Sequence, residues 1–180
     1  MSAHVFTRKP TAGDIPALLA LAQRSKAFHF PWIFAALTTE GWQDYLTRCQ
    51  QTDFEGLLIC HGKFSSGSSN NIPESPIVGV VNLSQIFYGP FQNAYLGYYA
   101  NVDFAGQGLM TKGMRLVIDY AFDTLKLHRL EANIQPDNVA SIKLVKRLGF
   151  SQEGFSRRYL KINGEWRDHQ RWALTVENWW

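Results

Sequence analysis

A glycine-containing turn between an expected strand and an expected helix most constrains the fold of this chain. Residues 94–102 are rich in aromatic and aliphatic side chains, Gly106-Gln107-Gly108 follows, and a helical pattern begins directly after it. One apolar stripe runs along that helix, formed by Met110, Met114, Val117, Ile118, Ala121 and Leu125. Glycine lets the backbone approach a ligand closely, and N–H groups at a helix start attract anions. The turn therefore indicates a phosphate-binding loop, with purely geometric glycines as the alternative.

A Rossmann-type dinucleotide site is a rival interpretation of this turn. Its fingerprint requires a third glycine at position 111 and an N-terminal strand–helix–strand unit. Position 111 is Thr111, and the turn lies in the second half of the chain. We therefore exclude a Rossmann site.

The composition indicates one globular domain over residues 1–180. Hydrophobic residues make up 46% of the 180 residues and charged residues 18%, as in ordinary proteins with a single core. The formal net charge of +3 is too small to indicate nucleic-acid binding by itself. Basic residues outnumber acidic ones between positions 143 and 171, a pattern compatible with an anionic ligand, an RNA surface or plain solvation.

Cysteine usage and the N-terminal residues bear on the compartment. Cys49 and Cys60 lack metal-ligand spacing and suit free thiols in a reducing environment. The first residues lack a signal-peptide pattern, and no apolar run approaches the ~20 residues of a membrane helix. We expect a cytoplasmic protein with no metal site and no DNA or membrane partner.

Apolar spacing and turn residues predict the remaining elements. Helices are expected from Asp14, as the N-cap, to about residue 22, over 39–50, from the glycine turn to about 125, and over 138–148. Strands are expected over 54–60, 77–86, 94–102, 129–134, 155–162 and 166–175, with Asn163-Gly164 turning the last hairpin. The Ser- and Gly-rich residues 65–73 are expected to form a long hairpin loop.

A second motif opens the last expected helix. Asn138 and Ser141 lie at its start, and Leu148-Gly149-Phe150 ends it. Either polar residue alone is most simply a cap or part of the first turn. Together with the glycine turn upstream, they favour a ligand site.

These two motifs resemble those of the GNAT acetyltransferases. The glycine turn is similar to their pyrophosphate loop, and Asn138, Ser141 and the Leu-Gly-Phe segment are similar to the helix that borders their coenzyme channel. More narrowly, residues 1–178 look like the RimJ type of ribosomal-protein-alanine acetyltransferase. The segments that carry this resemblance are Gly79-Val80-Val81-Asn82-Leu83-Ser84, Tyr95-Leu96-Gly97-Tyr98, Gly106-Gln107-Gly108-Leu109-Met110, Arg147-Leu148-Gly149-Phe150 and Asn163-Gly164-Glu165-Trp166-Arg167-Asp168-His169.

The resemblance implies an α/β (α+β) fold and a coenzyme site. Its sheet would be mixed, mostly antiparallel and seven-stranded, with splayed fourth and fifth strands and about four flanking helices. Acetyl-CoA would be the acetyl donor, with its pantetheine arm in the splay beside a bulge over 99–102. The implied coenzyme-binding residues are Tyr99, Ala100, Asn101, Val102, Ala105, Gly106, Gln107, Gly108, Leu109, Met110, Thr111, Asn138 and Ser141.

Three positions depart from the superfamily pattern. Asp103 stands where the loop usually begins with Gln or Arg, and Gln107 stands where many relatives have a basic residue. Phosphate binding is therefore expected to depend on main-chain N–H groups, aided by Lys143 or Arg147. Val145 replaces a tyrosine that acts as general acid in many members, so this proton donor is missing.

Acetyl transfer needs a neutral amine, a polarised thioester carbonyl and a proton for the departing sulfur. A main-chain N–H near Ala100 is expected to polarise the carbonyl. Glu131 aligns with a catalytic glutamate of related alanine acetyltransferases and is the first candidate base, with a noncatalytic strand glutamate as the alternative. Ser141 is the candidate hydrogen-bond donor to the leaving sulfur, with a helix-start role as the alternative. The C-terminal hairpin supplies reserve candidates: Tyr159, Asp168 and His169.

The resemblance implies transfer of an acetyl group to the N-terminal alanine of a small-subunit ribosomal protein, with a transient ribosome contact. One alternative is an acetyltransferase for a small amine, such as an antibiotic, a polyamine or an amino acid. Another is a noncatalytic acyl-CoA sensor or ribosome-binding module. Phe28-His29-Phe30-Pro31-Trp32 is expected to shape the acceptor entrance, with core packing as the alternative for its aromatic rings.

Overall fold

Seven strands form one mixed sheet in the order β1-β2-β3-β4-β5-β7-β6. The computed structural model describes residues 4–62 and 75–179, and within them every strand pairing except that of β4 with β5 is antiparallel. The strands are β1 (His4–Arg8), β2 (Phe54–Gly62), β3 (Ile77–Phe87), β4 (Asn93–Ala100), β5 (Arg129–Ile134), β6 (Ser151–Ile162) and β7 (Glu165–Thr175). The expected mixed, mostly antiparallel seven-stranded sheet is confirmed.

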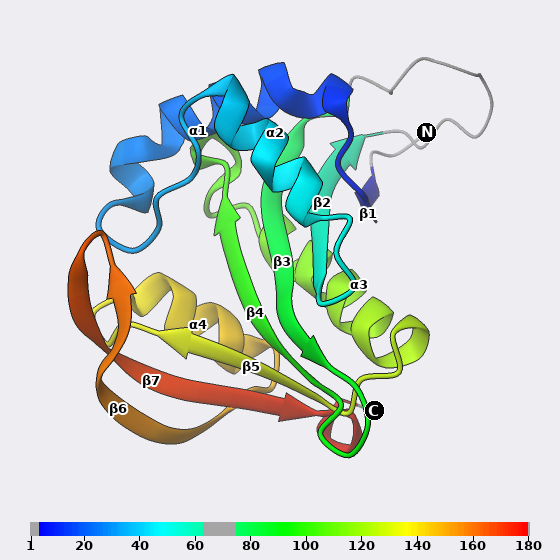
Figure 1. Cartoon of the computed structure of the whole chain (residues 1–180), viewed down its shortest axis with the longest axis vertical. Helices are drawn as coiled ribbons and strands as arrows, with labels where there is room; N and C mark the ends of the chain where they lie inside the picture. Colours follow the sequence, from blue (N-terminus) through cyan, green and yellow to red (C-terminus); the bar gives the residue numbers. More distant parts are fainter. Residues whose placement is uncertain (1–3, 63–74, 180) are drawn as a thin grey trace.

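The four α-helices of the described residues cover both faces of this sheet (Figure 1). They are α1 (Ile15–His29), α2 (Thr39–Arg48), α3 (Leu109–Asp119) and α4 (Val139–Arg147). Helices α1 and α2 bury Leu18 and Trp42 in one hydrophobic cluster with Val80 of β3. Helix α3 buries Met114 and Ile118 in a second cluster, on the other face. Strands β2 and β3 are therefore buried between two helical layers, whereas β6 stays largely exposed.

Helix α3 packs closely on strand β2. A Cβ atom at Gly113 would overlap the side chain of Ile59, so only glycine fits here without displacing that buried side chain. This close approach fixes the place of the helix N-terminus and of the glycine turn before it.

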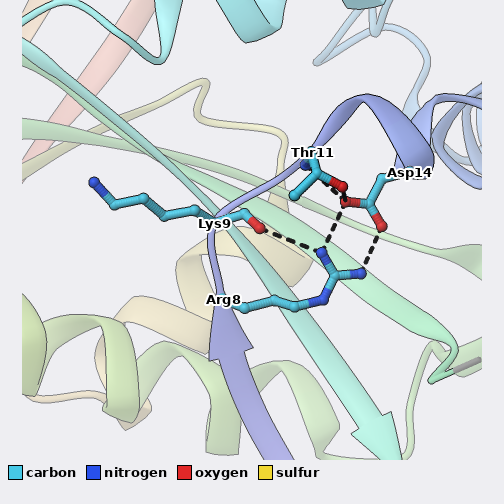
Figure 2. Close-up of polar contacts among 4 residues, drawn as sticks. All are labelled: Arg8, Lys9, Thr11 and Asp14. Carbon is cyan, nitrogen blue, oxygen red and sulfur yellow. Dashed lines mark hydrogen bonds and ion pairs between the residues drawn. The ribbon is translucent and has the colours of Figure 1, made fainter. Parts of the chain in front are cut away.

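A polar cluster joins the end of β1 to the start of α1 (Figure 2). The guanidinium of Arg8 donates to both carboxylate oxygens of Asp14, over 2.5 and 2.8 Å, and to the carbonyl of Lys9 over 3.2 Å. The same carboxylate accepts from the N–H and the hydroxyl of Thr11, over 2.7 and 2.9 Å. The prediction that Asp14 is the N-cap of the first helix is confirmed, but its side chain makes no bond to that helix, because the carboxylate turns back toward Arg8 and Thr11.

The environment of Asp14 stabilises its charged form. Burial on its own would raise the pKa of this carboxyl, but the hydrogen bonds from Arg8 and Thr11 outweigh burial and lower the pKa below its ordinary value. The cluster anchors β1, a short strand that the sequence pattern did not predict.

The other expected elements are present with shifted ends. The strand expected over 94–102 ends at Ala100, before a short 3-10 helix, η2 (Val102–Phe104). The strand expected from residue 155 begins at Ser151. The segment 65–73 lies outside the described residues. None of the helices within residues 4–62 and 75–179 is long and apolar enough to cross a membrane.

Candidate active site

The candidate site lies where β4 and β5 separate. These strands pair at three successive positions, from Asn93 with Arg129 to Tyr95 with Glu131. Both strands continue beyond this point, and Figure 1 shows them together near the C terminus and diverging toward the opposite end of the sheet. The expected splay of the fourth and fifth strands is confirmed.

Main-chain groups of β4 line the resulting gap. The N–H of Asn101 donates to the carbonyl of Val78, on the β3 side, over 2.7 Å. Because main-chain groups alternate in direction along a strand, those of Tyr99 also face β3, whereas those of Tyr98 and Ala100 face the gap. Among the residues expected to bind pantetheine, Ala100 is therefore the one whose main-chain groups point into the gap between β4 and β5.

Two of the other expected pantetheine contacts are engaged within the protein. The N–H of Asn101 is bonded to β3, and the N–H of Val102 donates to the hydroxyl of Ser25 over 3.1 Å. The expected bulge over 99–102 is also absent from β4, because the register with β3 is regular up to Ala100 and the register shift lies at the opposite end of this strand pair.

The last residue of α1 contacts β4 at the gap. Nε2 of His29 lies 2.7 Å from the carbonyl oxygen of Ala100, and since a carbonyl only accepts, Nε2 carries the hydrogen. The buried His29 ring also packs edge-on against Tyr99, with centroids 5.2 Å apart. From the sequence, His29 was predicted only as part of an aromatic segment, because this contact joins residues far apart in the chain.

The glycine turn combines an exposed main chain with open space. Gly106 has φ 75° and Gly108 φ 74°, a conformation that disfavours side chains. A Cβ atom at either position would meet nothing within 4 Å. The first bond of α3 runs from the N–H of Lys112 to the carbonyl of Gly108, so the N–H groups of residues 109–111 precede it. This arrangement can accept an anion.

At two positions that depart from the superfamily pattern, Asp103 and Gln107, the side chains have partners within the protein. Asp103 forms an ion pair with Arg24 of α1 over 3.0 Å, which offsets its negative charge. Gln107 donates to the main-chain carbonyl of Asp103 over 3.2 Å, so it closes the turn. Arg147 of α4 donates to the hydroxyl of Thr111 over 3.2 Å, which brings a guanidinium to the first turn of α3.

The start of α4 faces β4. Oδ1 of Asn138 accepts from the N–H of Ser141 over 3.2 Å, so the simple interpretation of Asn138 as a helix cap is confirmed. The hydroxyl oxygens of Ser141 and Tyr98 lie 2.6 Å apart. Tyr98 is a site residue that was not predicted from the sequence, although strand alternation from Leu96 would have placed its side chain on the α4 face.

Glu131 and Tyr159 both lie near Tyr95, on the opposite face of the sheet. Oε1 of Glu131 accepts from Nε of Arg129 over 2.8 Å, and Arg129 also pairs with Glu153. Burial, followed by the proximity of Tyr159 and Glu131, raises the pKa of Tyr95. Glu131 is therefore a carboxylate oriented by Arg129 and close to Tyr95, at the point where β4 and β5 separate.

The reserve candidates on the last hairpin are engaged within it. His169 is buried, and its Nδ1–H donates to the carbonyl of Arg167 over 2.9 Å. Burial lowers the pKa of His169, so the ring is neutral at neutral pH. A carboxylate oxygen of Asp168 accepts from the N–H of Arg158 over 2.8 Å. Both residues therefore have structural contacts.

Comparison with known families decides the assignment. The model of the acetyltransferase (GNAT) domain matches residues 4–151 of this chain. The chain belongs to the GNAT acetyltransferases. Members of this family use acetyl-CoA, which confirms the expected acetyl donor and the expected enzyme class.

Individual GNAT proteins show which members of the family this chain resembles. A probable N-acetyltransferase of Bacillus subtilis, YjcK, is 46% identical over 137 residues, which are 76% of this chain and 72% of that protein. The [ribosomal protein uS5]-alanine N-acetyltransferase of Escherichia coli is 37% identical over 139 residues, 77% of this chain and 69% of that protein. The crystal structure of ribosomal-protein-S5-alanine acetyltransferase from Vibrio fischeri superimposes with a TM-score of 0.80 and 28% identity, covering 98% of this chain and 96% of that one.

An open pocket of this GNAT domain lies beside the end of α1. It has a volume of about 530 Å³ and is lined by α1 and by residues that follow it, among them Phe30, Ile33 and Phe34. Phe28 is 47% and Phe30 62% exposed, so core packing does not explain these two rings of the aromatic segment. Because His29 lines the pocket and contacts Ala100, the pocket adjoins the end of β4.

Proposed function

We propose that this GNAT acetyltransferase acetylates the N-terminal alanine of a small-subunit ribosomal protein. The observation that carries the proposal is the 37% identity to the Escherichia coli uS5-alanine N-acetyltransferase over 77% of the chain. The similarity to the Vibrio fischeri structure over 98% of the chain supports it. The Bacillus subtilis relative supports the enzyme class without naming an acceptor.

The residues around the gap fit the coenzyme. The open space over Gly106 and Gly108, next to the N-terminus of α3, would receive the pyrophosphate on main-chain N–H groups of residues 106–111, since the N–H of Ala105 is already bonded to the carbonyl of Val102. Arg147 would add positive charge there. The gap-facing main chain of Tyr98 would bond the pantetheine arm. The side-chain amide nitrogen of Asn138 would bond the same arm, because its oxygen already caps α4.

The chain supplies three groups for acetyl transfer, while acetyl-CoA supplies the activated acetyl thioester. The N–H of Ala100 would polarise the thioester carbonyl. It is the main-chain group of this residue that remains for the substrate, since the carbonyl of Ala100 is bonded to His29. Glu131, oriented by Arg129, would accept the proton of the acceptor ammonium through water. Ser141 would donate a hydrogen bond to the departing sulfur.

The pocket beside α1 supports a peptide acceptor over a polyamine. Its lining residues include Arg24, Lys26 and several apolar side chains, and none of them is acidic. A polyamine is a polycation and gains affinity from carboxylates, whereas an N-terminal peptide carries a single positive charge at its amine. The charge of this pocket therefore favours the peptide.

Acetylation of a matched set of acceptors tests the proposal. The set comprises a ribosomal-protein N-terminal peptide that begins with alanine, the same peptide with leucine first, the alanine peptide with a blocked amine, and spermidine. With acetyl-CoA, we expect thiol release and a mass increase of one acetyl group for the alanine peptide alone. Turnover of spermidine without turnover of the peptide would promote the small-amine alternative. Absence of turnover with every acceptor would promote a noncatalytic module.

A further inference from the structure

A hydroxyl pair connects β4 to α4 at the gap. Oη of Tyr98 lies 2.6 Å from Oγ of Ser141 and 3.4 Å from the main-chain carbonyl oxygen of the same serine. Tyr98 lies beyond the last position at which β4 pairs with β5, and Ser141 lies in the helix that follows β5. The pair therefore lies beside the gap in which the coenzyme arm would pass.

Either hydroxyl of the pair can donate to the other, and Tyr98 keeps the hydrogen it needs to be the donor. Burial, opposed in part by the bond to Ser141, raises the pKa of Tyr98 to about 12, so its phenol stays protonated. Both Ser141 oxygens near the phenol can accept its hydrogen, the hydroxyl oxygen at 2.6 Å and the carbonyl oxygen at 3.4 Å, and the carbonyl can only accept. With Tyr98 as the donor, the hydroxyl hydrogen of Ser141 is left for a third group.

The rest of Ser141 is already committed. Its N–H donates to the cap residue Asn138 over 3.2 Å. One turn further along α4, Val145 is fully buried in the apolar core and carries no hydrogen that a sulfur atom can accept. Ser141, in contrast with Val145, has a polar hydrogen that a neighbouring strand directs.

We propose that Tyr98 is a positioning residue of acetyl transfer, which orients the Ser141 hydroxyl so that it donates to the sulfur of the leaving group. The inference rests on the proposed function. As the amine nitrogen bonds to the acetyl carbon, the carbon–sulfur bond breaks and its electron pair stays on sulfur, where the Ser141 hydrogen bond stabilises it. The proton that the amine releases passes through water and ends on that sulfur, so a neutral thiol and an amide are formed. Tyr98 remains protonated throughout.

Removal of a single oxygen atom tests this role. Tyr98→Phe keeps the ring and deletes the hydroxyl, and we expect kcat with acetyl-CoA and the alanine peptide to fall about tenfold or more. The KM of the peptide and the Kd of acetyl-CoA are expected to stay within about twofold, because neither depends on hydrogen-bonding the departing sulfur. Ser141→Ala is expected to lower kcat as much, and the double variant no further than either single one.

Tyr45→Phe is the matched control. Its hydroxyl is also partly buried and bonds a side chain, Oδ1 of Asn82, over 2.8 Å, but it contacts α2 and β3 and not α4. Both tyrosine variants are expected to lose similar stability, and only Tyr98→Phe to lose kcat. If the wild-type enzyme turns over and Tyr98→Phe has an unchanged kcat, the inference is overturned and the proposed function stands. The same conclusion follows if the fold-losses in kcat of the two single variants multiply in the double variant. A wild-type protein without turnover would overturn the proposed function itself.

Discussion

Strand β4 has two neighbours, and its contacts with them differ in extent. With β3 it pairs continuously from Tyr95 to Ala100, and the ladder extends to Asn101 through the bond to Val78. With β5 it pairs only from Asn93 to Tyr95. Main-chain groups without a partner usually occur at the edge of a sheet, but this sheet has them in its middle. The gap therefore offers main-chain hydrogen-bonding groups at the proposed coenzyme site.

The two sides of β4 are also stabilised differently. On the β1–β3 side, the cluster of Arg8, Thr11 and Asp14 closes the edge of the sheet, and two strands are covered on both faces. On the β5 side, the bond between Tyr98 and Ser141 connects β4 to α4. We therefore expect substitutions on the first side to change stability and substitutions at the gap to change binding and turnover.

The largest effect is expected from Asp14→Ala. This change leaves Arg8, whose side chain is 20% exposed, without its carboxylate partner, and breaking a buried pair costs about 3–5 kcal/mol. Urea unfolding measures the loss. The Kd of acetyl-CoA for the remaining folded protein is expected to stay unchanged. If Asp14→Ala unfolded at the same urea concentration as the wild type but bound acetyl-CoA more weakly, the β1–β3 side would affect binding instead of stability. That result would contradict the proposed difference between the two sides of β4.

Gly108→Val is expected to weaken acetyl-CoA binding about 100-fold, which corresponds to about 2.7 kcal/mol. The valine side chain would occupy the open space that the phosphates need, at a φ of 74°. Calorimetry measures the affinity. Gly89→Val is the matched control, because Gly89 has φ 76° and equally open surroundings but lies in the β3–β4 turn. Equal affinities in the two variants would contradict the assignment of the phosphate site.

Glu131→Gln is expected to lower kcat about tenfold or more and to change its dependence on pH, with coenzyme affinity unchanged. Steady-state kinetics across a pH series measures both effects. Glu153→Gln is the control, because Glu153 pairs with the same Arg129 from the exposed surface of β6. If the two variants have the same kcat, Glu131 is not the base.

The smallest effect is expected from the titration of His169. Its pKa is lowered by burial, so below a pH of about 6.5 the unfolded chain binds a proton that the folded chain does not. Folding stability is therefore full above that pH and falls as the pH decreases toward the pKa of the folded state. Urea unfolding at several pH values measures the slope, which is expected to flatten in His169→Gln. An unchanged slope in that variant would assign the effect to other groups.

Local requirements made some parts of this molecule predictable from sequence. The glycine turn was predictable because Gly106 and Gly108 adopt positive φ, a property of single residues. The Asn138 cap was predictable because its bond reaches three residues along the chain. Strand β1 was missed, since five residues with weak alternation become a strand only beside β2.

Contacts between distant residues account for what sequence reasoning missed at the site. His29 contacts Ala100, and Tyr98 contacts Ser141, across 71 and 43 positions of the chain. The engagement of Asn101 with β3 likewise depends on which neighbour β4 faces at that position. Such properties follow from the register of the sheet and from helix placement, which residue types alone do not specify.

Amide hydrogen exchange with and without coenzyme A tests most directly whether the gap beside β4 is the coenzyme site. We predict slower exchange on binding at Tyr98, Ala100 and residues 106–111, whose N–H groups face the gap or the open turn. Little change is expected at Asn101 and Ala105, which are already bonded to Val78 and Val102. Protection confined to other elements, with residues 98–111 unchanged under saturating coenzyme, would contradict this assignment.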